Sequence, residues 1–182
     1  MQTFVANFQV PTQIALCVVL AVLSGLFIVA IEGYNAKLQE FGIQNAIAIE
    51  MPWTPSRADA LISQLGDEGV RVARKQTYLD FGFLIVYPLT IALLCVLLGA
   101  KAGNAVSVAA PTIAVGVLFA GLFDAIENMA MLVMLSGRTG SPWPQISSIF
   151  AAIKFTLVLG GIAYVAIALI SITVRSIGAW LR

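Results

Sequence analysis

Four apolar stretches, each long enough to cross a lipid bilayer as a helix, constrain the fold of this chain more than any other feature. They occupy residues 12–31, 78–100, 111–135 and 146–174. About 20 helical residues cover the roughly 30 Å of hydrocarbon in a bilayer, and a helix satisfies its own backbone polar groups where water is absent. The fourth stretch is longer than necessary, so we expect it to tilt or to extend into water. The sequence therefore predicts an all-α integral membrane four-helix bundle.

The composition indicates that the lipid bilayer is the main partner of the chain. Only 10% of the 182 residues are charged and 60% are hydrophobic, whereas a soluble domain carries about 25% charged residues. The net charge is +1 and there is no basic run, which argues against nucleic acid as a partner. The chain has no histidine, and its two cysteines form no CxxC pair. We therefore predict no metal site and no cofactor, because the commonest ligands are missing.

The connections between the apolar stretches differ in length. Residues 101–110 and 136–145 contain Gly, Ser, Asn and Pro, which is typical of turns. The helices that such short connections join should be antiparallel neighbours. The first connection, residues 32–77, is long and holds most of the charge. We interpret residues 1–182 as a single membrane domain.

A short amphipathic helix is predicted inside the long connection. Ser56 can act as its N-cap, with Asp59 three residues further on. An apolar face follows at helical spacing, made by Ala58, Leu61, Ile62 and Leu65. We expect this helix to lie on the cytoplasmic surface of the bilayer, and a docking site for a partner is the alternative. Gly66 and Gly69 interrupt the pattern, and Asp67 can cap a second helix that leads into the membrane.

The distribution of Lys and Arg predicts the orientation. The first and third connections carry Lys37, Arg57, Arg71, Arg74, Lys75 and Arg138. The opposite side carries Lys101, Arg175 and Arg182. Because basic residues accumulate on the cytoplasmic side, the long connection should be cytoplasmic and both termini should lie outside.

Ionisable residues inside the apolar stretches are the main functional signal, because charges in hydrocarbon are costly and usually serve a function. Asp124, Glu127 and Asn128 lie in the third stretch. Their spacing of i, i+3, i+4 places all three on one helical face. Asp80 opens the second stretch, and Tyr87 lies two turns further along the same face.

Two more ionisable residues lie at a similar depth. Lys154 is about two turns inside the fourth stretch, and Glu32 ends the first. All these charges therefore fall in the same half of the membrane, where we expect a binding or ion-pair cluster. Its members are Glu32, Asp80, Tyr87, Asp124, Glu127, Asn128 and Lys154. The most specific expectation is an ion pair between Glu127 and Lys154.

The predicted cluster has an excess of acid, with four carboxylates against one ammonium group. The unmatched carboxylates must be protonated, hydrogen-bonded, or neutralised by a cation or a partner. Plainer interpretations are also open. Lys154 can extend to the headgroups, Glu32 and Asp80 can be boundary residues that face water, and the polar residues of the third stretch can form a structural lock that fixes helix register.

Two short segments resemble a known family. The first, residues 79–87, reads LDFGFLIVY, and the second, residues 124–128, reads DAIEN. Together they are similar to a family of bacterial multi-pass membrane proteins with an LDFxFxxxY segment followed by a DxxEN segment. The resemblance implies that Asp80, Tyr87, Asp124, Glu127 and Asn128 belong together, in a protein of the bacterial inner membrane. It implies no substrate and no cofactor.

Three classes of function fit these features. The first is an accessory or scaffold subunit of a larger membrane assembly, because the chain is small and its acidic cluster can await other membrane subunits. The second is a small proton- or cation-coupled transporter or channel, although inverted repeats, which mark many transporters, are not evident. The third is a lipid-acting membrane enzyme that uses paired carboxylates, Asp124 and Glu127. We favour the first class, and an enzyme less than either of the others.

Overall fold

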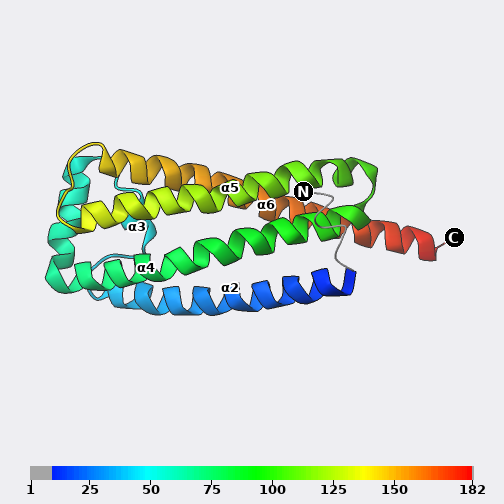
Figure 1. Cartoon of the computed structure of the whole chain (residues 1–182), viewed down its shortest axis with the longest axis horizontal. Helices are drawn as coiled ribbons and strands as arrows, with labels where there is room; N and C mark the ends of the chain where they lie inside the picture. Colours follow the sequence, from blue (N-terminus) through cyan, green and yellow to red (C-terminus); the bar gives the residue numbers. More distant parts are fainter. Residues whose placement is uncertain (1–9, 182) are drawn as a thin grey trace.

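The computed structural model describes residues 10–181, apart from the side chains of Val10 and Asn104, and this part of the chain is built from helices without strands. The elements are α2 (Val10–Gln39), α3 (Ile47–Glu50), α4 (Pro55–Ala102), α5 (Asn104–Leu135) and α6 (Trp143–Trp180). The four long helices lie side by side as a bundle, and α3 lies at one end of it (Figure 1). The all-α prediction is therefore confirmed.

Each of the four long helices is long and apolar enough to cross a membrane, as the sequence predicts. All four helices extend beyond the apolar stretches. This is possible because only the part of a helix that lies in lipid needs apolar side chains. The predicted turn at residues 101–110 is wrong: Gly103 alone separates α4 from α5, and residues 104–110 are already helical. Gly103 has a φ of 104°, a conformation that glycine adopts without steric cost, so one residue suffices for the reversal.

Helix α4 is the centre of the packing. It contacts α2, α5 and α6, and α5 also contacts α6. Small residues allow the helices to approach closely. A Cβ added at Gly161 of α6 would lie 2.5 Å from Val117 of α5, whereas a Cβ at Gly160 would meet nothing. Of these two adjacent glycines, only Gly161 therefore lies at a close helix–helix contact.

The long connection folds back over the end of the bundle. The N-cap of α4 is Thr54, whose hydroxyl accepts a hydrogen bond from the Arg57 backbone N–H, so the prediction of Ser56 is wrong by two residues. Gly66 takes a non-helical conformation with a φ of 60° and divides α4 into two helical segments, so a second segment that leads into the bundle starts after Gly66, as predicted.

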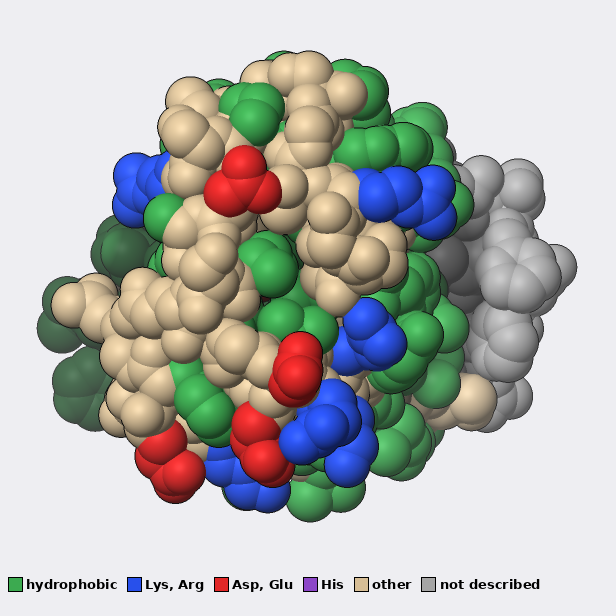
Figure 2. All heavy atoms as spheres, turned by 90° about the vertical axis from the view of Figure 1, so that its left-hand side faces the viewer, with side chains coloured by type: hydrophobic (Ala, Val, Ile, Leu, Met, Phe, Trp, Pro, Cys, Tyr) green, Lys and Arg blue, Asp and Glu red, His purple; other side chains and the backbone are tan. Residues whose placement is uncertain are grey.

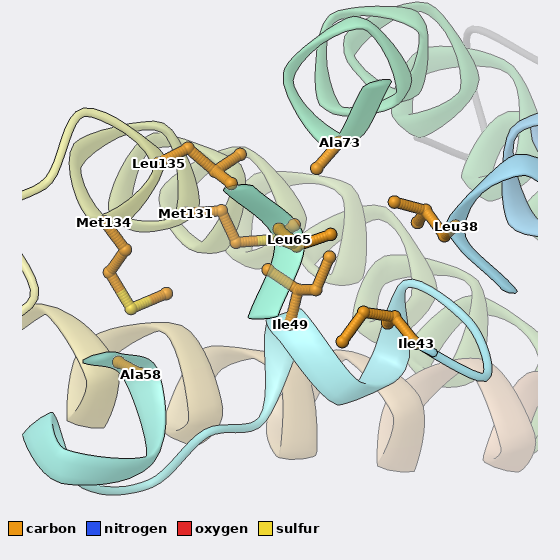
Figure 3. Packing of buried hydrophobic residues seen from close by; sticks show 9 residues of the cluster. All are labelled: Leu38, Ile43, Ile49, Ala58, Leu65, Ala73, Met131, Met134 and Leu135. Carbon is orange, nitrogen blue, oxygen red and sulfur yellow. The ribbon is translucent and has the colours of Figure 1, made fainter. Parts of the chain in front are cut away.

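The apolar face of residues 55–65 packs against the protein itself. Ala58 and Leu65 join a buried cluster with Ile49, Met134 and Leu135, drawn in Figure 3. The other two residues of the face, Leu61 and Ile62, are partly buried against the same cluster. The surface that we expected to rest on the bilayer is thus largely used to close the end of the bundle.

The same end of the molecule carries many of the exposed charges. Figure 2 shows this end face, where Lys, Arg, Asp and Glu side chains gather between polar surface. The exposed charged residues of this end lie in the first connection (residues 32–77) and the third (residues 136–145). They include Arg57, Asp59, Asp67, Glu68, Arg71, Lys75 and Arg138. In contrast, many large apolar side chains on the outer surfaces of the long helices are exposed, a pattern that suits hydrocarbon on the sides and water at the end.

Candidate functional site: a buried ion cluster beside a cavity

Lys154 of α6 is the centre of the buried cluster. Its Nζ atom donates hydrogen bonds to Asp124 Oδ1 at 3.0 Å and to Glu127 Oε1 at 2.9 Å. All three side chains are buried, and Glu127 is completely inaccessible. The two carboxylates lie one helical turn apart on α5, so a single lysine on the neighbouring helix reaches both. The structure therefore brings Asp124, Glu127 and Lys154 together, and Lys154 does not extend outward.

A third carboxylate, which the sequence analysis missed, approaches the same lysine. Glu50 Oε2 lies 3.6 Å from Lys154 Nζ. Hydrogen bonds fix the chain around it: Ser147 Oγ donates to the Glu50 carbonyl at 2.7 Å, and the Trp53 N–H donates to Ser148 Oγ at 2.8 Å. The available signal was an acid that ends the short apolar run IAIE within a polar connection.

Burial raises the pKa of the Glu50 carboxyl above its ordinary value, and the nearby Asp124 carboxylate acts in the same direction. The positive charge of Lys154 opposes this change without reversing it. The reason is that a charged carboxylate loses more by leaving water than it regains from a lysine that two other carboxylates already share.

Asp80 of α4 belongs to the cluster through an amide. Its Oδ2 accepts a hydrogen bond from Asn128 Nδ2 at 2.7 Å. Among residues 10–181, no Lys or Arg lies within ion-pair distance of Asp80. Asp80 is therefore the member of the cluster whose only direct contact of this kind is with a neutral donor, while Lys154 acts on it from beyond ion-pair distance.

Tyr87 lies two turns further along α4, with its ring 4.9 Å from that of Phe83. The side chain is buried, with 7% of its surface exposed. Its hydroxyl lies near the Asp124 carboxylate but makes no hydrogen bond of ordinary geometry in the part of the chain that the structure describes. An unpartnered buried hydroxyl costs free energy and calls for an explanation.

A cavity of about 570 Å³ lies beside the cluster. Helices α2 and α6 line its two sides, and α4 lies between them. Asp80, Tyr87, Asp124 and Lys154 all line it, together with Glu50. Glu127 does not, and thus sits behind Lys154 as the inaccessible half of an ion pair.

Glu32 takes a different place from the other predicted residues. It is exposed and lines the cavity about two turns before the end of α2, without forming an ion pair with Lys154. Its Oε1 accepts a hydrogen bond from Asn35, whose Oδ1 in turn accepts from the Ala46 N–H and from Gln76 Nε2. This network holds the connection after α2 against α4, beside the cavity.

The cluster as a whole contains more negative than positive groups. Three carboxylates, those of Glu50, Asp124 and Glu127, lie against one ammonium group, and the carboxylate of Asp80 is a fourth that lies beyond ion-pair distance of it. Lys154 and Glu127 neutralise each other, and Asp124 shares the lysine. The groups that face the cavity are consequently rich in hydrogen-bond acceptors, which suits a cationic or donor-rich ligand.

The fold and the site define a class: an all-helical bundle with four candidate membrane spans and a buried cluster of charged residues beside a cavity. Comparisons with protein-family models, with curated proteins and with solved structures found no match for this chain. Its function must therefore be argued from the site.

Proposed function

We propose that this chain is an integral membrane protein that binds a cation at its buried cluster, as a small cation-coupled transporter or channel would. The observation that carries the proposal is Asp80. This carboxylate lines the cavity, is hydrogen-bonded only to Asn128, and has no cationic partner among the described residues.

Charge balance supports a cation over other ligands. A carboxylate away from water is costly unless an opposite charge accompanies it. Lys154 is already shared by three acids and lies beyond ion-pair distance of Asp80, so it offsets the charge of Asp80 only in part. A cation beside Asp80 and Asp124 would reduce the excess negative charge where the cavity gives access to it.

The position of the cavity supports entry from one half of the membrane. The cavity lies toward the end that carries α3. Toward the opposite end, α4, α5 and α6 pack tightly through small residues, including Ala92, Cys95, Ala114 and Ala168. We propose that the α3 end is cytoplasmic, that both termini lie outside, and that the membrane is a bacterial inner membrane, as the charge distribution and the family resemblance suggest.

The test measures stabilisation of the purified protein by cations. Unfolding in detergent would be followed by tryptophan fluorescence with potassium, methylammonium or decylammonium chloride, with N-methylglucamine chloride as the bulky reference salt. At least one cation should raise the melting temperature of the wild type more than that of Asp80→Asn, which keeps an acceptor for Asn128. Asp67→Asn, which removes an exposed acid outside the cavity, should respond like the wild type. Equal responses of the wild type and Asp80→Asn to all three cations would overturn the proposal.

An accessory-subunit function is the second candidate, and the surface of α2 favours it. This helix packs mainly against α4, and its outer side chains Val22, Leu26 and Val29 are 58%, 62% and 72% exposed. A helix of a partner subunit could cover this surface in place of lipid. A subunit that co-purifies in fixed ratio with the wild type and is lost with Val29→Trp would favour this candidate, whereas a solitary chain would count against it.

A further inference from the structure

The cavity combines two surfaces that suit the two parts of a single ligand. On the polar side, Asp80 and Asp124 each use one oxygen atom in a hydrogen bond and keep the other for a further donor. The rest of the lining is largely apolar and includes Ile28, Phe83, Ile91, Phe155, Val158 and Ile162. A volume of about 570 Å³ lies within the range of sites for small organic ligands, about 300–1,000 Å³, and far exceeds the needs of a bare ion.

Tyr87 gives an independent indication of a ligand at this place. It lines the cavity on the same helix as Asp80, and its buried hydroxyl makes no hydrogen bond of ordinary geometry within residues 10–181. Buried polar groups are normally satisfied by the protein, by water or by a ligand. An ammonium group is a suitable partner, because it offers three donors and no acceptor.

We propose that the cavity binds an amphiphilic amine, whose ammonium group lies between Asp80, Asp124 and Tyr87 and whose hydrocarbon tail lies along the apolar lining. This inference rests on the proposed cation site and names its ligand. Apolar side chains favour hydrocarbon over the water shell of an inorganic ion. The excess of carboxylates disfavours amphiphiles with an anionic headgroup.

The headgroup part of the inference is tested with ligands of equal tail length and different charge. Decylammonium, decanol and decanoate would be compared with methylammonium in the melting assay. Decylammonium should stabilise the wild type at lower concentration than any of the other three. Its apparent affinity should fall about tenfold in Asp80→Asn, as expected for the loss of one charge-assisted hydrogen bond. Tyr87→Phe should weaken binding by a smaller factor without lowering the melting temperature of the free protein, because it removes an unpartnered group.

The tail part is tested with two neighbouring positions on α6. Val158 lines the cavity, whereas Leu159 does not and is 63% exposed. Val158→Trp should reduce the affinity for decylammonium about tenfold by displacing about two buried methylene groups, and it should leave the response to methylammonium intact. Leu159→Trp should respond to both cations like the wild type.

The outcomes separate the two proposals. If methylammonium and decylammonium bind equally well and Val158→Trp has no effect, the proposal of an amphiphilic amine is wrong, whereas the proposal of a cation site is retained. If neither cation distinguishes the wild type from Asp80→Asn, both fail. The amine can be a free ligand or the ammonium headgroup of a membrane lipid. A smaller decylammonium effect in bilayers of phosphatidylethanolamine than in phosphatidylcholine would identify the lipid as a source, and equal effects would identify a free amine.

Discussion

Lys154 Nζ lies 2.8 Å from Glu127 Oε2, across 27 positions of sequence and two neighbouring helices. Glu127 is inaccessible and does not line the cavity, so this pair is a fixed structural contact beside the groups that face the cavity. The same lysine lies 3.0 Å from Asp124. Lys154 therefore connects the inaccessible carboxylate of Glu127 with the carboxylate of Asp124, which lines the cavity.

The first prediction concerns this ion pair. Lys154→Met should lower the free energy of unfolding by about 3–5 kcal/mol, because it strands buried carboxylates. Glu127→Gln should lower it by less, because Lys154 keeps Asp124 as a partner at 3.0 Å. Lys154→Met should be the more harmful, since Lys154 also approaches Asp124 and Glu50. The double variant should lose less than the sum of the single losses. Reversible unfolding in mixed detergent measures all three, with the exposed Lys101→Met as the control. Strict additivity would show that the pair is not coupled.

The second prediction uses the two adjacent glycines of α6. Gly161→Ala should destabilise the protein by about 1–3 kcal/mol, because the new methyl group would overlap Val117 and Ile91, which are stiff, β-branched side chains. Gly160→Ala faces open space and should be neutral or stabilising by up to about 1 kcal/mol, since alanine favours a helix more than glycine does. The same unfolding assay compares them. Equal melting temperatures for the two variants would contradict the packing of α6 against α4 and α5.

The third prediction concerns the start of α4. Thr54→Ala should cost about 1 kcal/mol, because Thr54 supplies the capping oxygen for the Arg57 N–H. Ser56→Ala, two residues further on, should change stability by no more than about 0.5 kcal/mol, since Ser56 is an exposed residue of the first turn. Thermal unfolding distinguishes them, and a larger loss from Ser56→Ala would restore the sequence-based cap assignment.

The fourth prediction concerns membrane topology. In a background where Cys17 and Cys95 are replaced by alanine, single cysteines would be placed at Glu68 and Gly178, which are both exposed. An impermeant maleimide should label Gly178→Cys in intact cells and should label Glu68→Cys only after the membrane is opened. The reverse result would invert the proposed orientation. Labelling of both sites in intact cells would contradict an arrangement in which the membrane separates them.

The sequence by itself determined the helices and the depth of the charges. Long apolar stretches can satisfy their backbone in lipid only as helices, which is why four helices of membrane-spanning length were predictable from hydrophobicity. Depth along a helix follows from a rise of 1.5 Å per residue, and therefore Glu127 and Lys154 could be matched before any contact was known.

The turns and caps were less predictable from the sequence. The polar composition of residues 101–110 predicts a loop, yet helix propensity and packing extend α5 to Asn104 and leave only Gly103 for the reversal. By residue type, Ser56 is a somewhat better cap than Thr54. The choice between them depends on where the preceding chain is held, and Trp53 is tied to Ser148 on α6.

Only the tertiary structure decided which charges meet and what they face. Glu50 reaches Lys154 because hydrogen bonds to Ser147 and Ser148 fix the chain around it, nearly a hundred residues away in sequence. The cavity between α2 and α6 likewise has no sequence signature, since apolar side chains that face lipid, a neighbouring helix or a ligand are chemically alike. Hydrophobicity depends on local composition and can be read from the chain, whereas the rotation of each helix about its axis is settled by packing against its neighbours.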